Sequence, residues 1–401
     1  RDYIHRKKMT LDIALELKKD SILIQKGSIV QIENVKTELS GKIIQGKIIN
    51  LDFACEEQEL INIINNTPEH LKSIYRSFQA NGIVNCNGNI KGLVSNESNP
   101  HLDMICNIEK GNFNLKSRPF ILKNISLSAK INNGEQKDFH NTKIEISDFD
   151  AKTENGFLKG DFSIQNLNKY YLTANLKSSW DLAEINHYFE DSPFYNLQGK
   201  LYANTQYSGY ISFDRKFTNY FLAANYTSKT SFKEASFTYK SFPLGFNFNT
   251  AECTFKNNQI EVKNSTFSIA DSDFDFEGNI TDLIGYILKK KDQVNITGKF
   301  KSTYMKFDEL LTLKDMSEGK GAGIMPNWIS VNLNTNIRTF SHDDFIASDI
   351  TGQLTYKNKT ITWEDIRLNS LNGNIVGNFK FYESKNNKLI LFSQLNLKQL
   401  N

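Results

Sequence analysis

Alternation of apolar and polar side chains with a period of two dominates residues 157–189 and restricts this stretch to β-structure. Leu158 and Phe162 share one face of a first strand, and Leu172 and Leu176 share one face of a second. Residues 166–169 between them have turn composition, so the pattern is typical of a β-hairpin. The second strand runs directly into the sequence DLAEI, where Asp181 can cap a short helix. The predicted unit is therefore strand, turn, strand and short helix.

The same unit recurs along the chain with a glycine in its first strand. Copies begin near Phe274, where the hairpin leads into a helix expected at 307–311, and near Gly373. A fainter copy begins at Gly41 and leads into an expected helix over 57–64. The first three helix starts lie roughly 125 residues apart, beyond the periods of solenoid repeats. We interpret the chain as a divergent series of β-hairpins punctuated by short helices.

The whole chain is expected to form about 22–28 strands and about three or four short helices. It contains no alternation of strands with long helices, which excludes a parallel α/β sheet. At ~4.8 Å per strand, one continuous sheet of this size would extend roughly 110–130 Å. The expected fold is all-β: an elongated, mostly antiparallel sheet that curls into an open apolar groove.

Breaks in this pattern divide the chain into five expected parts. A helical insertion is predicted where Thr67 and Pro68 make a helix start, and a flexible loop is predicted around the glycines that follow Gly319. The parts are an N-terminal β-segment (1–56), the helical insertion (57–80), central β-repeats (81–316), the flexible loop (317–327) and a C-terminal β-segment (328–401).

Charge and motif composition argue against several classes of function. The net charge of +3 and the absence of a long basic run argue against nucleic-acid binding. Residues 271–278 resemble a calcium loop, but Phe276 stands where such a loop needs glycine. His342 and Asp343 could supply an acid and a base, yet we interpret this segment as a turn. We expect no enzyme activity, no cofactor and no metal site.

Four cysteines are present, at positions 55, 86, 106 and 253, without metal-ligand spacing. Cys86 and Cys106 fall nearly opposite each other if 83–94 and 101–110 form a hairpin, and both then lie on its apolar face. They could form a disulfide, and two buried free thiols are the interpretation we favour.

One face of the expected sheet is apolar and too large to stay bare in water. Too little helix is available to cover it. A two-sheet sandwich would divide into modules of ~100 residues joined by linkers, and only one good linker is visible, near Gly319. Closing the sheet on itself is awkward because the helices interrupt it, so an open groove filled by an apolar ligand fits best. The residues expected to line the groove are Leu158, Phe162, Leu172, Leu176, Phe274, Phe276, Ile296, Phe300, Leu354, Phe379 and Leu391.

The hairpin-and-helix unit over 160–185 resembles the AsmA-like proteins of Gram-negative envelopes, which are related to TamB and YhdP. The stretch ANGIVNCNGNIKGLV, followed by HLDMICNIEKGNF, is similar to another motif of that family. Residues 373–400 resemble the end of its C-terminal region, and the abundance of Asn, Phe and Tyr resembles members from Bacteroidota. The membrane helix typical of the family is absent, and we expect this sequence to be a segment of a longer protein.

The resemblance implies a periplasmic protein anchored in the inner membrane by a segment outside this sequence. Such a protein would carry phospholipids between the inner and outer membranes along its groove and support outer-membrane biogenesis. Its partners would be phospholipid acyl chains and the two membranes, and not nucleic acid. Two alternatives stay open: a structural or adhesive envelope protein without a ligand, and a polysaccharide-binding β-solenoid.

Overall fold

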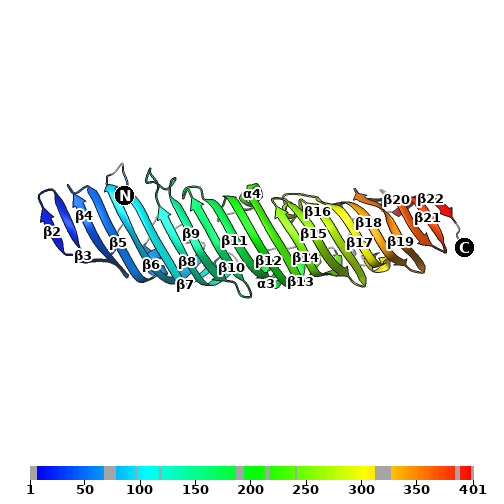
Figure 1. Cartoon of the computed structure of the whole chain (residues 1–401), viewed down its shortest axis with the longest axis horizontal. Coiled ribbons are helices and arrows are strands. Elements are labelled where there is room, and N and C mark those ends of the chain that lie inside the picture. The colour runs from blue at the N-terminus through cyan, green and yellow to red at the C-terminus, as the bar shows by residue number, and fades with distance from the viewer. Residues whose placement is uncertain are drawn as a thin grey trace. The chain divides into compact units, whose positions relative to one another are not determined.

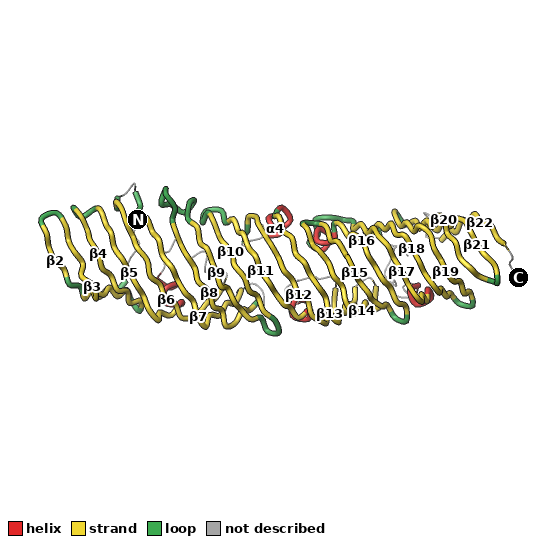
Figure 2. The backbone as a smooth tube through the Cα atoms, in the orientation of Figure 1, coloured by secondary structure: helices red, strands yellow, loops and turns green. Residues whose placement is uncertain are grey.

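The computed structural model describes residues 7–66, 78–95, 98–116, 120–186, 194–212, 217–239, 242–311, 327–383 and 389–398. Within these ranges, 22 strands are assigned to one sheet, and the described helices are short (Figures 1 and 2). The sheet is not closed, because the described pairings join β1 and β2 only to β3, and β22 only to β21. This confirms the prediction of an all-β, mostly antiparallel sheet with few short helices.

The chain divides into two compact units, one of residues 1–180 with 204–225 and one of residues 181–203 with 226–401. Strand β12 (Phe194–Tyr210) contributes residues to both. The first unit contains β1 (Met9–Asp12), β2 (Leu15–Lys18), β3 (Ser21–Ile32), β4 (Val35–Ile44), β5 (Ile48–Glu59), α1 (Leu60–Asn66), β6 (Phe78–Leu93), β7 (His101–Leu115), β8 (Ile121–Asn132), β9 (Lys143–Lys152), β10 (Phe157–Gln165), β11 (Tyr171–Asp181) and α4 (Phe217–Ala223). The second unit contains α3 (Leu182–Asn186), β13 (Asn225–Tyr239), β14 (Phe242–Lys256), β15 (Gln259–Ile269), β16 (Ser272–Thr281), α5 (Leu283–Ile287), β17 (Val294–Lys306), α6 (Phe307–Leu311), β18 (Ile329–His342), β19 (Phe345–Lys357), β20 (Thr360–Ser370), β21 (Gly373–Glu383) and β22 (Leu389–Lys398).

In the first unit, each strand from β4 to β11 pairs antiparallel with the strand before it in the sequence. The hairpin predicted from the alternation is β10–β11, in which Gly160 lies opposite Leu176 and Phe162 lies opposite Ala174. Strands β1 and β2 both pair with β3, because the extended chain is interrupted at residues 13 and 14.

In the second unit, each strand from β14 to β22 pairs with the strand before it in the sequence, and one of these described pairings is parallel while the others are antiparallel. Strands β17 and β18 are parallel, with Ile296 opposite Val331. Parallel neighbours need a connection that returns the chain to its starting edge, and α6 begins that connection. The helix was predicted from the sequence and the parallel step was not. Most of the predicted loop 317–327 lies outside the described residues.

The short helices were predicted only in part. Helices α3 and α6 stand where the sequence placed them, and the Asp181 carboxylate accepts a hydrogen bond from the Ala183 N–H (3.0 Å) as an N-cap does. Helix α1 begins at Leu60, because β5 continues to Glu59, and the predicted start at Thr67 lies outside the described residues. Helices α4 and α5 were missed. Asp282 precedes α5 as Asp181 precedes α3, so the sequence contained a helix-start signal that the prediction did not use, although the Asp282 side chain makes no capping hydrogen bond.

Glycines recur in the first strand of the repeated unit because the facing strand comes too close for a side chain. At Gly41, Gly160, Gly278 and Gly377, an added Cβ would overlap the backbone carbonyl oxygen of a residue on the next strand. At Gly160 the φ of +143° adds backbone strain for any other residue. The repeated unit therefore repeats a backbone geometry, and the glycines are the residues of the unit that this geometry requires.

Hydrophobic clusters are assembled from consecutive strands within each unit. In the second unit, Ile337, Ala347, Ile350 and Ile366 are almost fully buried and form a cluster across β18, β19 and β20. In the first unit, one cluster is built around Val84 on β6 and spans neighbouring strands and α1. All the described strands belong to a single sheet, so these clusters form between neighbouring strands of that sheet and not between two packed sheets.

Candidate functional site

The residues predicted to line a groove lie on one face of the sheet in each unit. In the first unit, Phe162 is opposite Ala174, and Leu158, Leu172 and Leu176 lie on the same side because residues two apart on a strand share a face. Leu158 and Phe162 pack against a cluster that contains the fully buried Ala151. These four residues are brought together as the alternation predicted.

In the second unit, the other seven predicted residues also share one face. Phe276 is opposite Phe300, Leu354 is opposite Trp363, and Trp363 is in turn opposite Phe379. Directly paired residues share a face of the sheet, and the other pairs that place the predicted residues on this face are Ile280–Ile296, Phe267–Phe274, Gly298–Leu333, Leu333–Leu354 and Phe381–Leu391. No Lys, Arg, Asp or Glu is paired with any of the seven in the described strands. That this face holds a ligand stays a prediction.

A ladder of phenylalanine rings runs across this face of the second unit. Its ring centroids lie 5.0–5.2 Å apart over most steps: Phe194–Phe237 (5.2 Å), Phe237–Phe246 (5.0 Å), Phe248–Phe267 (5.1 Å), Phe267–Phe274 (5.2 Å) and Phe274–Phe300 (5.1 Å). Ring contacts at this spacing stabilise neighbouring strands beyond the area they bury. The sequence prediction found only the last two rings. The alternation GFNFN at 245–249 was the signal that could have found Phe246 and Phe248.

Exposure varies along the face. Phe274 is buried with 4% of its surface exposed, whereas Leu391 on the edge strand β22 is 62% exposed. The other nine predicted residues are half-buried. Phe274 is therefore the one buried ring of the ladder, and the other rings are half-buried like the aliphatic side chains of the face.

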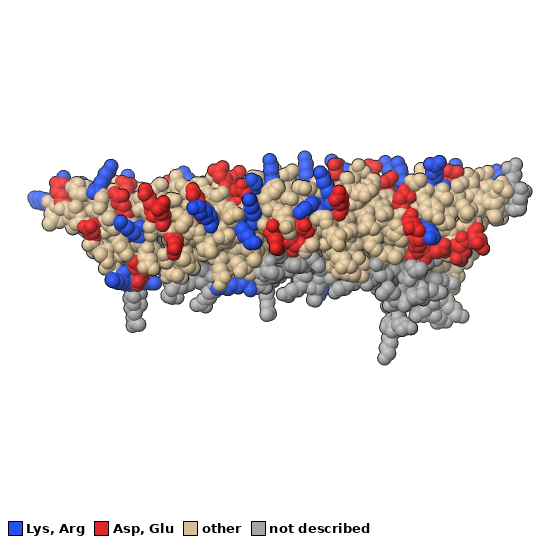
Figure 3. Space-filling view, turned by 90° about the horizontal axis from the view of Figure 1, so that it is seen from below, with Lys and Arg blue, Asp and Glu red and all other residues tan. Residues whose placement is uncertain are grey.

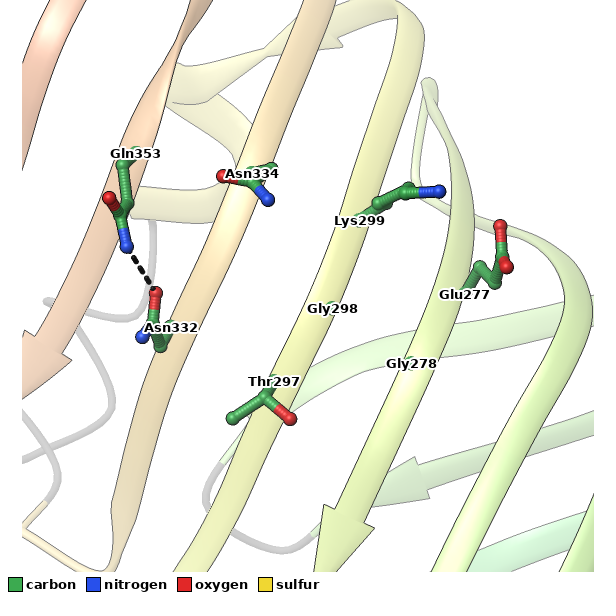
Figure 4. Close-up of a pocket in the computed structure, with 8 residues that line it drawn as sticks. All are labelled: Glu277, Gly278, Thr297, Gly298, Lys299, Asn332, Asn334 and Gln353. Atoms are coloured by element: carbon green, nitrogen blue, oxygen red, sulfur yellow. Dashed lines mark hydrogen bonds between the residues drawn. The ribbon is translucent and has the colours of Figure 1, made fainter.

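On strands β16 to β19, the opposite face of the second unit carries polar side chains. Glu277 on β16 lies opposite Lys299 on β17, which lies beside Asn334 on β18 and, through it, Gln353 on β19. Figure 4 shows these side chains around a shallow hollow of about 420 Å³, where Gln353 Nε2 donates to Asn332 Oδ1 over 3.0 Å. Amide and charged groups without an aromatic ring line this hollow, so it offers hydrogen bonds and no stacking surface.

Figure 3 shows charged side chains of both signs interspersed over most of the face, with several acidic side chains gathered near its right-hand end. This agrees with the net charge of +3. Such a surface keeps the polar face in water and gives no footprint for a polyanion.

The carboxylates of the calcium-like segment are engaged by the protein itself. Asp273 accepts hydrogen bonds from the backbone N–H groups of Thr303 (3.0 Å) and Tyr304 (2.6 Å), and Asp271 lies 3.4 Å from the Lys306 ammonium. Partial burial is the largest single influence on Asp273 and raises its pKa, but the hydrogen bonds together outweigh it and lower the pKa. These contacts hold Asp271 and Asp273 against β17.

Asp308, His342 and Asp343 form the one candidate metal cluster in the part of the chain that the structure describes, with ligand atoms within 4.8 Å of one another. Asp308 bonds to the His342 ring and accepts a hydrogen bond from the Asp343 N–H (2.9 Å), which lowers the pKa of Asp308. Residues 343 and 344 form the β18–β19 turn, as predicted. The cluster ties this turn to the start of α6, and its internal hydrogen bonds account for its arrangement.

Three of the four cysteines lie in one row across β5, β6 and β7. Cys86 is opposite Cys55 on one side and Cys106 on the other. Cys86 and Cys106 are joined by a disulfide with Cα atoms 4.2 Å apart, so they are not the free thiols that we favoured from the sequence. Cys55 and Cys253 are free, and burial raises the pKa of the Cys253 thiol to about 11.

No family model, no curated protein and no solved structure matches this chain. None of the helices in the described ranges has the length and hydrophobicity needed to cross a membrane. The function must therefore be argued from the geometry of the two sheet faces.

Proposed function

We propose that this chain holds phospholipid acyl chains against the apolar face of its sheet and carries them between the inner and outer membranes of a Gram-negative envelope. The observation that carries this proposal is the continuity of the face in the second unit, because apolar residues occupy it on consecutive strands and no charged residue is paired with the predicted ones among the described strands. Its resemblance to AsmA-like proteins supports the same function, and the anchor would lie outside this sequence.

The energetics of partition favour such binding. Each methylene group removed from water contributes ~0.8 kcal/mol, so a chain of about 16 carbons prefers the apolar face by around ten kcal/mol before losses. The half-buried side chains on the apolar face of each unit, such as Leu158 in the first and Phe379 in the second, supply surface of this kind. Successive strands present similar side chains about 4.8 Å apart, so the binding free energy of an acyl chain varies little from one strand to the next. A lipid could therefore slide along the face without an energy source at each step.

Head groups would stay in water, which removes the need for a specific polar pocket. The curling of the sheet into a groove is part of this proposal, and the overlap at Gly41, Gly160, Gly278 and Gly377 supports it. Glycine within strands commonly marks bends or close approach of backbones. A groove bent at such points would shield the acyl chains on both sides.

A ligand-free structural protein of the envelope is the second candidate, and the ring ladder favours it. Contacts such as Phe237–Phe246 and Phe267–Phe274 remove part of the apolar surface from water by packing neighbouring rings of the same face against each other. If the half-buried residues outside the ladder are also covered by segments beyond the described residues, no surface remains for lipid. The two candidates therefore differ in whether the face accepts an acyl chain.

Adjacent positions on β17 allow a direct test with a matched control. Ile296 lies on the apolar face and Thr297 on the polar face. The variants Ile296→Glu and Thr297→Glu are compared for binding of a phospholipid with a fluorescent acyl chain, with far-UV circular dichroism as the folding control. We expect Ile296→Glu to lose at least about tenfold in binding, since a carboxylate on the face must be desolvated. Equal binding by both folded variants would contradict the proposal and support the ligand-free protein.

A further inference from the structure

The three cysteines of β5, β6 and β7 occupy an arrangement that the proposed lipid function does not use. Cys55, Cys86 and Cys106 are directly opposite one another on three neighbouring strands, which lie side by side in Figure 1. Directly opposed residues project from the same face of a sheet. The three side chains therefore form a row perpendicular to the strands, with Cys86 in the middle.

Sheet geometry brings Cys86 within bonding range of both neighbours. In an antiparallel sheet, a residue of a central strand makes a narrow pair with one neighbouring strand and a wide pair with the other. The Cα separation of 4.2 Å identifies Cys86–Cys106 as the narrow pair. Cys55–Cys86 is then the wide pair, for which Cα atoms lie about 5.5 Å apart, and this spacing is common for disulfides.

The free thiol of Cys55 contacts the strand that carries Cys86. The Cys55 sulfur makes a hydrogen bond with the Cys86 backbone and packs against the cluster that contains the disulfide. Cys55 is half-exposed, whereas Cys86 and Cys106 are each only 8% exposed. A thiol in solution is therefore screened from the disulfide, and the thiol inside the protein is not.

We propose that Cys55, Cys86 and Cys106 form a thiol–disulfide exchange site in which the disulfide moves between the β6–β7 pair and the β5–β6 pair. In the forward step, the Cys55 thiolate attacks the Cys86 sulfur, a Cys55–Cys86 bond forms, the Cys86–Cys106 bond breaks, and Cys106 leaves as the thiolate. One thiolate is consumed and one is released, so the step needs no oxidant or reductant. The order of the three residues across the strands places Cys86 between the attacking Cys55 and the leaving Cys106.

The exchange changes which loop of the chain is closed. The Cys86–Cys106 bond closes a loop of 20 residues, and the Cys55–Cys86 bond would close a loop of about 30 residues that includes α1. Loop-closure probabilities at these lengths differ by a factor of only about two, so chain entropy gives neither state a large advantage. The half-exposed Cys55 would then belong to the disulfide, which opens that bond to thiols in solution.

Alkylation mapping of the full chain tests the exchange without perturbing the row. Cys253→Ser leaves the three cysteines alone; the protein is incubated without added thiol, denatured at low pH, labelled with N-ethylmaleimide and mapped by peptide mass spectrometry. We expect label at both Cys55 and Cys106. At pH values below the pKa of the Cys55 thiol, the rate of exchange should rise about tenfold for each unit by which the pH is raised, because the thiolate is the nucleophile. Burial raises the pKa of Cys55, so this dependence should extend above neutral pH. Label confined to Cys55 at every pH would overturn the proposal.

Two further variants in the Cys253→Ser background provide a matched pair. Cys106→Ser keeps the adjacent Cys55 and Cys86, and we expect it to form their disulfide within one chain on mild oxidation. Cys86→Ser keeps Cys55 and Cys106, which are two strands or about 10 Å apart, and we expect both to remain free. A folded Cys106→Ser chain that keeps two free thiols, or that links only to other chains, would contradict the proposal. If this variant does not fold, the mapping of the unaltered row decides.

Discussion

Gly160 on β10 lies directly opposite Leu176 on β11, and a Cβ at Gly160 would overlap the carbonyl oxygen of Asn175. The strand therefore approaches its neighbour at this point with no room for a side chain. The same overlap occurs at three other glycines of the repeated unit. This relationship connects a sequence repeat to a repeated backbone geometry, and it can be tested by adding a single methyl group.

Gly160→Ala is expected to destabilise the first unit by roughly 2–4 kcal/mol, through the steric overlap and the strained φ. Gly245→Ala on β14 is the matched control, because a Cβ there meets no atom within 4 Å. The free energies of unfolding are measured by urea denaturation. Equal stability of the two variants would show that β10 and β11 do not approach as closely as described.

The core of the second unit offers a comparison between two isoleucines. Ile337 is 1% exposed inside its cluster, and Ile346 is 64% exposed on the neighbouring strand. Ile337→Ala is expected to cost about 2–5 kcal/mol, because it removes buried surface and leaves a cavity. Ile346→Ala is expected to change stability by less than about 0.5 kcal/mol. Thermal unfolding of both variants checks the burial, and a similar loss from each would contradict it.

Asp273 predicts a pH dependence with a definite sign. Its folded-state pKa is lowered by the N–H groups of Thr303 and Tyr304, so the ionised carboxylate stabilises the folded chain. This contribution is present at pH values above the ordinary pKa of about 4 and is lost as the pH falls through the lowered folded-state value.

Asp273→Asn should therefore be less stable than the unaltered chain at neutral pH, and the difference should shrink in acid. Asp275→Asn, at an exposed position two residues along β16, serves as the control and is expected to change stability by less than about 0.5 kcal/mol at neutral pH. Urea denaturation at several pH values gives both differences. A difference for Asp273→Asn that grows as the pH falls would contradict the assigned hydrogen bonds.

The parts of the fold that the sequence predicted are those controlled by local pattern. Alternation placed Leu158, Phe162 and Leu172 on one face, because side chains of a strand alternate without help from distant residues. Asp181 marked the start of α3, since an N-cap is a local hydrogen bond. Cys86 and Cys106 were placed opposite each other by the expected hairpin alone.

The parts that were missed depend on register and on connections. Phe267 lies directly opposite both Phe248 and Phe274, and this register depends on which turns join β14, β15 and β16, which alternation within one strand does not give. The parallel pairing of β17 with β18 depends on the path of the chain after α6. Helix α5 follows Asp282, a residue type that favours helix starts, but the apolar run LIGYI after it is too short to be told from a strand by its pattern.

The most direct test of the central claim is native mass spectrometry with lipid extraction on the chain purified gently from its own envelope. The proposed function predicts that phospholipids copurify with the chain, at several molecules per chain, and that Ile296→Glu reduces their number while Thr297→Glu does not. A stable, folded chain free of lipid would contradict the claim. It would mean that protein covers the apolar face, and the ligand-free structural function would replace lipid transfer.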